Sequence, residues 1–153
     1  MTRAFDFRFV AVAPGRLALW HRPKLRAIPY LQAAGCDRVV TLLSEREGAR
    51  EIGLAVEAVE LAWSWIPLSS GRPPEGAPAQ RARHGIAELS ERLDAGEAIL
   101  IHCSAGMHRT GMLAYALLRR RGVAQEAALQ RIAAMRPVAR SALTPAHLAW
   151  GEP

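Results

Sequence analysis

The alternation of apolar and polar side chains predicts where this chain forms strands and helices. Residues 5–10 alternate as a half-buried strand does, and residues 16–20, 38–43, 62–66 and 98–102 are further strand candidates. Helical spacing, caps and breakers predict helices in the segments between and after them. These helices are expected at residues 29–35, 44–59, 80–95, 109–121 and 124–135, with a short last helix that Thr144 and Pro145 open.

Strands that alternate with helices indicate an α/β fold. We expect a central, mainly parallel twisted sheet of about 4–5 strands flanked by helices. The sequence has no repeats and no linker, so residues 1–153 are expected to form one domain. Ligands of such sheets bind at the carboxyl ends of the strands. This rule predicts a site among the loops at 20–26, 43–46, 67–78 and 103–109.

The composition narrows the class of protein. Half of the 153 residues are hydrophobic (50%), so a core can form without disulfides. The 2 cysteines have no metal-type spacing and fit a reducing compartment, so we expect neither a metal nor a cofactor. No apolar run approaches the roughly 18 residues that span a bilayer. The N-terminus lacks the pattern of a signal peptide, so a cytoplasmic location without a membrane segment is expected.

The charge balance favours an anionic ligand. The formal net charge is +6, and arginine supplies nearly all of the positive charge because Lys24 is the only lysine. The sequence shows neither zinc-finger spacing nor a basic stripe interleaved with aromatic residues. Nucleic acid is therefore expected as a partner only through a phosphorylated end. The oligomeric state is left open.

The segment at 102–110, HCSAGMHRT, carries the chemistry. Cys103 and Arg109 stand on a strand-to-helix turn with five residues between them. Backbone N–H groups of such a turn cradle a phosphate, and the planar arginine fork grips two of its oxygens. A cysteine at this place attacks phosphorus as a thiolate, which the helix N-terminus and nearby cations favour, including His102 if it is protonated. Thr110 is well placed to bond the sulfur.

The residues of the turn itself are the candidate phosphate ligands. Gly106 permits a backbone conformation closed to other residues. Two other interpretations stay open at this point: Cys103 as a small buried residue at a strand end, and His108 either as a loop filler or as a contact to substrate. The candidate phosphate-binding residues are Ser104, Ala105, Gly106, Met107, His108 and Arg109.

The motif at 102–110 resembles the phosphate loop of the cysteine-dependent protein tyrosine and dual-specificity phosphatases. Weaker similarity extends over about 8–150, through segments 38–45, 66–68, 136–137 and 143–147, and the short chain is similar to the compact dual-specificity group. The resemblance implies a fold of that type and phosphorylated substrates, either phosphoproteins or small molecules. It also implies roles in catalysis: Cys103 as nucleophile, Arg109 as phosphate clamp, Thr110 as sulfur partner and His102 as the residue that positions the cysteine.

Two positions depart from the family pattern. Where the family carries an aspartate that protonates the leaving oxygen, the alignment places Ser70, which is not a useful acid near neutral pH. Glu75 is the only carboxyl group in the 67–78 loop, either a substitute acid or a solvated side chain. Where some members use a glutamine to position the hydrolytic water, His147 stands here. It is expected either to take that part or to cap a helix.

Cys36 and the basic segment at 20–26 are two further features of the sequence. Cys36 precedes a strand while Cys103 follows one, so in a parallel sheet they lie at opposite ends, beyond disulfide reach, and Cys36 is expected to be a buried small residue. The basic segment at 20–26 lies at the same sheet edge as the turn. It is either an ordinary solvated loop or a wall that attracts a polyanionic substrate.

These features support an active phosphatase that works through a cysteinyl-phosphate intermediate. The missing aspartate favours, as the alternative, a catalytically weak phosphate-binding module. Sulfur or arsenate transfer through the same type of turn is a third hypothesis, against which the arginine at 109 and the threonine at 110 argue.

Overall fold

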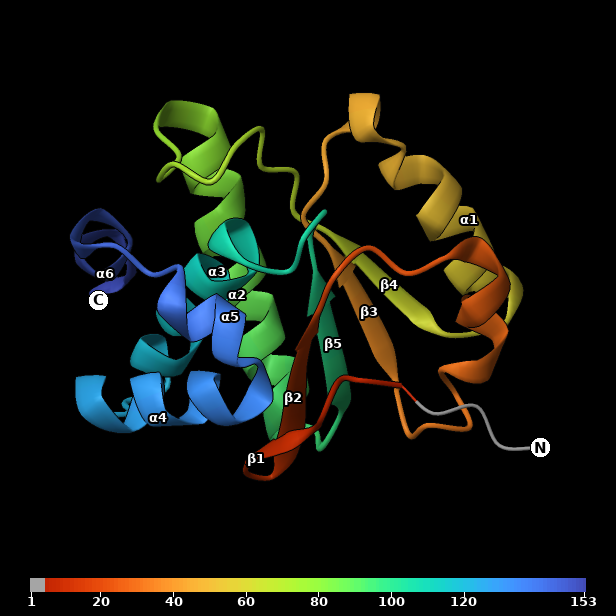
Figure 1. Cartoon of the computed structure of the whole chain (residues 1–153), viewed down its shortest axis with the longest axis horizontal. Helices are drawn as coiled ribbons and strands as arrows, with labels where there is room; N and C mark the ends of the chain where they lie inside the picture. The colour runs from red at the N-terminus through yellow and green to blue at the C-terminus, as the bar shows by residue number, and fades with distance from the viewer. Residues whose placement is uncertain (1–4) are drawn as a thin grey trace.

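A five-stranded sheet forms the centre of the computed structural model, which describes residues 5–153 (Figure 1). The spatial order is β1-β2-β5-β3-β4, and all neighbours are parallel except β1 and β2. The expectation of a mainly parallel α/β sheet is confirmed. The strands are β1 (Val10–Val12), β2 (Gly15–Trp20), β3 (Arg38–Thr41), β4 (Ala62–Trp65) and β5 (Ala98–His102).

Helices cover both faces of this sheet because its side chains alternate between two cores. Leu17 and Leu19 of β2 enter one core, and Ala18 and Trp20 enter the other. In Figure 1, α1 (Ala49–Ala58) and the 3₁₀ helix η1 (Leu25–Tyr30) lie on one side of the sheet. The other side carries α2 (Gly76–Asp94), α3 (His108–Arg120), α4 (Gln125–Met135), α5 (Pro137–Ser141) and α6 (Pro145–Gly151).

The strand predicted at 5–10 is wrong. Pairing begins only at Val10, opposite Leu17. The alternation upstream instead reflects one-sided aromatic packing: the Phe5 and Phe7 rings stack at 5.1 Å, and both lie against Trp20. Burial of these rings produces the apolar-polar pattern without a hydrogen-bonded neighbour strand.

Several helix boundaries also differ from the prediction. Gly48, with φ of 90°, divides the helix expected at 44–59 into the 3₁₀ helix η2 (Glu45–Glu47) and α1. The helix expected at 29–35 is η1 followed by turns, and α2 begins at Gly76 rather than at residue 80. Helix α5 follows the helix expected at 124–135 and was not predicted. A proline ends a preceding helix, but Pro137 is also the first residue of a new one.

Among the helices of residues 5–153, none is long and apolar enough to cross a membrane.

Candidate active site

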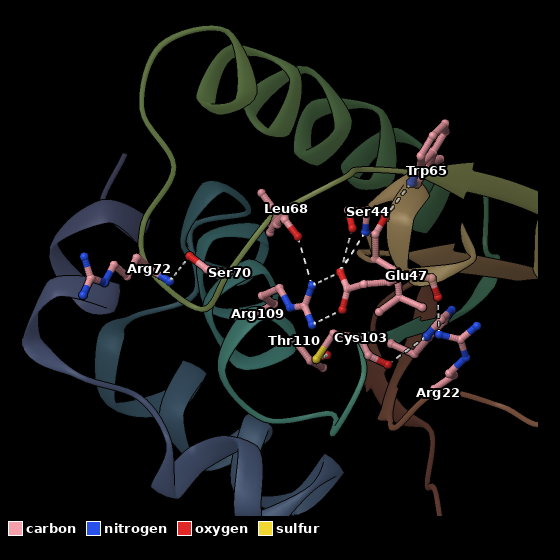
Figure 2. A network of polar contacts seen from close by, with 12 residues as sticks. Arg22, Ser44, Glu47, Trp65, Leu68, Ser70, Arg72, Cys103, Arg109 and Thr110 are labelled. Atoms are coloured by element: carbon pink, nitrogen blue, oxygen red, sulfur yellow. Dashed lines mark hydrogen bonds and ion pairs between the residues drawn. The ribbon is translucent and has the colours of Figure 1, made fainter. Parts of the chain in front are cut away.

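The predicted nucleophile lies between β5 and α3. Cys103 directly follows the strand and is buried, with 3% of its surface exposed. The Thr110 hydroxyl, in the first turn of α3, donates a hydrogen bond of 3.0 Å to the Sγ atom of Cys103 (Figure 2). A donor aimed at sulfur stabilises negative charge on it.

Gly106 lets the turn between Cys103 and α3 pack closely on the end of β2. Its φ is 69°, in the left-handed region. A Cβ atom at this position would lie 2.4 Å from the carbonyl oxygen of Trp20. Both the backbone conformation and the space therefore require glycine.

Three carbonyl groups of the turn are held from outside. The backbone N–H of Arg22 donates to the Ser104 oxygen at 2.9 Å. The Arg136 guanidinium donates through Nε to the Gly106 oxygen at 2.9 Å and through Nη2 to the Ala105 oxygen at 3.2 Å. In a trans peptide the next N–H points opposite to the carbonyl. The N–H groups of residues 105–107 therefore point away from these donors and are free for an anion inside the turn.

Arg109 is fixed before any substrate arrives. Its Nη1 and Nη2 atoms donate to the two carboxylate oxygens of Glu47 at 2.7 and 3.0 Å, and Nη1 also donates to the Leu68 carbonyl at 3.0 Å (Figure 2). A two-point contact of this kind sets the plane of the guanidinium as well as its place.

Glu47 is the functional neighbour that sequence reasoning missed. It lies three residues after Ser44, which is the spacing of a capping box, and the Ser44 backbone N–H donates to its carboxylate at 3.0 Å. The hydrogen bond from Arg109 is the main reason why the pKa of Glu47 falls from 4.5 to about 2. The capping pattern explained the residue locally, and nothing in it pointed to an arginine 62 positions away.

His102 supports Cys103 as a neutral ring. Burial lowers its pKa from 6.5 to about 4, so His102 does not supply the positive charge considered for it. Its Nδ1 lies 3.1 Å from the Cys103 carbonyl, which can only accept, so Nδ1 carries the proton. Nε2 then accepts from the Thr41 hydroxyl at 2.8 Å, and the Trp63 indole donates to that same oxygen.

The loops predicted at the carboxyl ends of the strands do meet here. Arg22, of the 20–26 loop, contacts the turn through Ser104. Arg109 donates to Glu47, just beyond the 43–46 loop, and to Leu68 of the 67–78 loop. The predicted convergence is confirmed.

Residues 67–75, here called the facing loop, carry the two candidates for the general acid. Ser70 is exposed, and its Oγ accepts from the Arg72 backbone N–H at 3.2 Å. Glu75 is exposed and immediately precedes α2. Both residues line a hollow of about 380 Å³ whose walls all come from residues 68–78. The turn at residues 103–109, here called the phosphate turn, does not contribute to that hollow.

Two histidines flank the facing loop at Gly71. Thr144 donates its backbone N–H to Nδ1 of His147 at 3.1 Å, and Nε2 of His147 faces the Gly71 carbonyl at 2.6 Å. Both ring nitrogens of His147 are thus engaged in capping α6 and holding the loop. His108 is exposed on the other side, and a Cβ atom on Gly71 would lie 2.7 Å from the Cβ of His108.

The basic segment at 20–26 divides into two parts. The Arg22 side chain is half-buried and donates to the Glu47 carbonyl, so it braces the loops around the turn. Lys24 and Arg26 are exposed.

The two cysteines are free and lie apart, as expected. Cys36 precedes β3, Cys103 follows β5, and these strands are parallel neighbours. Cys36 is buried, its thiol donates to the Arg38 carbonyl at 3.2 Å, and burial raises its pKa to about 12.

Comparison with known proteins finds a matching family model and similar solved structures. Residues 6–147 match the family model described as PTP-SAK, Swiss Army Knife protein, DSP-PTPase phosphatase domain. Among solved structures, the active form of Tk-PTP is 25% identical, with a TM-score of 0.72 over 89% of this chain and 88% of that one. Human DUSP28 is 24% identical, with a TM-score of 0.68 over 88% and 87%.

A DUF442 protein from Shewanella putrefaciens CN-32 also shares the fold. It is 20% identical, with a TM-score of 0.68 over 95% of this chain and 90% of that one. No curated protein sequence matches this chain.

The parallel sheet and the cysteine turn define a cysteine-dependent phosphatase of the protein tyrosine and dual-specificity type. The family model covers nearly the whole chain, and the chain belongs to the PTP-SAK family of dual-specificity phosphatase domains.

Proposed function

We propose that this chain hydrolyses phosphate monoesters through a cysteinyl-phosphate intermediate. The observation that carries the proposal is the hydrogen bond from Thr110 to the sulfur of Cys103, on a turn whose Arg109 is already fixed by Glu47. A sulfur nucleophile, an anion cradle and an oriented cation are the parts that a phosphate ester needs for attack at phosphorus.

The reaction then has two steps. In the first, the Cys103 thiolate forms a bond to phosphorus and the bond to the ester oxygen breaks, so that the alcohol leaves with one added proton. In the second, water attacks phosphorus and gives up one proton, the sulfur–phosphorus bond breaks, and phosphate leaves, so that the proton taken up in the first step is returned. The Thr110 hydroxyl stabilises the departing thiolate, and Arg109 and the N–H groups of the turn hold the equatorial oxygens in both steps.

Phosphoproteins and small phosphorylated molecules both fit this chemistry. With Ser70 where the family has its acid, we expect faster turnover of esters whose leaving groups need little protonation, such as phenols or phosphoanhydrides. The basic positions 24 and 26 are exposed and favour a substrate with additional negative charge.

Substitution of the nucleophile is the direct test. We expect Cys103→Ser to lower kcat/KM on p-nitrophenyl phosphate by about 10⁴-fold or more. We expect Arg109→Ala to lower it by about 10²–10³-fold. The control is Cys36→Ser, because Cys36 lies at the opposite end of the parallel strands. Rapid denaturation during turnover should trap phosphate on Cys103 of the wild type as an alkali-stable, iodine-sensitive S–P adduct.

Two results would overturn the proposal in different ways. Full activity of Cys103→Ser would exclude the cysteinyl-phosphate route. Tight binding of phosphate esters by the wild type without turnover would make the chain a phosphate-binding module.

A further inference from the structure

The departing alcohol must receive a proton, and the described active site offers few groups that can give one. Ser70 occupies the position of the family acid, and a serine hydroxyl does not release its proton near neutral pH. Glu75 lines a hollow formed by the facing loop and the start of α2, and no residue of the turn at 103–109 lines that hollow. The group that serves the leaving oxygen must lie between the phosphate turn and the facing loop.

His108 lies in that place. It immediately precedes Arg109 and is the first residue of α3, and its side chain is exposed at the rim of the turn. Its Cβ lies 2.7 Å from where a Cβ on Gly71 would be, so only glycine lets the facing loop pass this close to the histidine. Gly71 directly follows Ser70. The imidazole therefore borders the same part of the loop from which an aspartate at position 70 would act.

His147 holds the other side of this contact. It lies opposite the loop, with its ring centroid 6.1 Å from that of His108, and Nε2 donates to the Gly71 carbonyl at 2.6 Å. Because Thr144 occupies Nδ1, the His147 ring is fixed and has no nitrogen left for proton transfer to substrate. The facing loop is thus fixed against His108, whose ring remains exposed.

We propose that His108 is the general acid and base of this phosphatase. The inference rests on the proposed function, because it needs the cysteinyl-phosphate route. As the sulfur–phosphorus bond forms and the bond to the ester oxygen breaks, the His108 imidazolium gives its proton to that oxygen. The neutral imidazole then takes a proton from the water that attacks phosphorus, the thiolate leaves, and the imidazolium is restored.

Imidazole is the side chain most often used for such transfers near neutral pH. The segments that meet at the site carry other charged or titratable side chains. These are Cys103 and Arg109 in the turn, Arg72 and Glu75 in the facing loop, Glu47 in η2, Arg136 and Arg140 at α5 and His147 in α6.

The test compares leaving groups in His108→Gln. Glutamine keeps hydrogen-bonding capacity but cannot supply a proton as an acid. We expect the rate of cysteine phosphorylation to fall about 10²-fold for an alkyl ester, O-phosphoserine, and less for phenyl phosphate. For p-nitrophenyl phosphate, whose leaving group needs no proton, the rate should change less than about 3-fold. The matched control is His84→Gln, an exposed histidine on α2.

A second measurement distinguishes proton transfer by His108 from a purely structural role. The inhibition constant of orthovanadate, which occupies the phosphate turn, should be unchanged in His108→Gln. Equal losses on all three esters together with weaker vanadate binding would make His108 a phosphate ligand and overturn the proposal. Unchanged rates on all three would also overturn it, while loss of activity in Cys103→Ser would still support the route through cysteine.

Two further variants locate the proton donor. Introducing Ser70→Asp into His108→Gln should restore the alkyl-ester rate, because the carboxylate would border the same place. Glu75→Gln should leave the leaving-group dependence as in the wild type. A selective loss on alkyl esters in Glu75→Gln instead of His108→Gln would assign the acid to Glu75.

Discussion

The phosphate turn at 103–109 and the facing loop at 67–75 meet at one site but are built in different ways. The turn is held from several elements: Arg136 and Arg22 hold its carbonyls, and Glu47 fixes its arginine. The facing loop is bound at Leu68 and Gly71, and its residues 69 and 70 are exposed.

This difference separates two tasks of catalysis. Binding and activating a phosphate needs donors that are already aimed, since reorienting them during the reaction raises the barrier. Supplying a proton needs only one titratable group within reach of the leaving oxygen, and different side chains can perform it. The first task fixes the residue types of the turn, while the second allows Ser70 where an aspartate is usual.

Among changes outside the nucleophile, the largest effect should come from Gly106→Ala, which disturbs the rigid phosphate turn. The added Cβ would meet the Trp20 oxygen at 2.4 Å in a conformation with φ of 69°. To relieve this contact the turn must move, so its N–H groups no longer converge. We expect kcat/KM on p-nitrophenyl phosphate to fall about 10²–10³-fold, with about 1–3 kcal/mol lost from the free energy of unfolding in urea.

Gly122→Ala is the control for backbone strain alone. Gly122 has φ of 84°, and a Cβ there meets nothing within 4 Å. This variant should lose stability without losing activity. If both variants lose activity alike, close packing on Trp20 is not what shapes the turn.

A smaller effect is expected from Glu47→Gln, which weakens the contact that orients Arg109 and keeps the capping box with Ser44. Glutamine still accepts from Ser44 but presents one oxygen instead of a charged pair, so Arg109 loses its two-point contact. We expect about a 10-fold weaker inhibition by orthovanadate and a similar loss in kcat/KM.

Glu45→Gln is the matched control. Glu45 lies two residues earlier in η2 and pairs with Arg50 at 2.8 Å, where both side chains are about two-thirds exposed (66% and 65%). Its removal should leave vanadate binding unchanged. Equal effects of the two variants would mean that the net charge of η2, rather than the grip on Arg109, matters.

The sequence predicted the turn well because its signals are local. An apolar strand, a glycine with positive φ and a helix start follow one another within 98–111, and each is encoded by adjacent residues. The parallel sheet followed from the alternation of strands and helices. The aromatic residues at 5–9 misled the same reasoning, because burial of rings against Trp20 produces the period of a strand without a partner strand.

The supports of the turn could not be predicted in this way. Glu47 and Arg109 are 62 positions apart, and Arg136 is 30 positions from the carbonyl of Gly106. Such contacts depend on how the helices pack on the sheet. His147 shows the same limit, since its bond to Gly71 spans 76 positions and needs α6 docked beside the facing loop.

The last prediction concerns His102, the buried neighbour of Cys103, and it measures the pH dependence of stability instead of activity. The pKa of His102 is lowered from 6.5 to about 4, so the unfolded chain binds one more proton between these values. The neutral ring contributes its full share to the free energy of unfolding above pH 6.5. This contribution, on the order of 3 kcal/mol, is lost as the pH falls through about 4.

The free energy of unfolding of the wild type, measured in urea, should therefore decrease from pH 7 to pH 4.5. In His102→Gln most of this decrease should be absent. His84→Gln, at an exposed position, should keep the wild-type slope. An unchanged slope in His102→Gln would mean that carboxylates such as Glu47 carry the acid sensitivity, and that the neutral His102 ring does not tie the turn to β3.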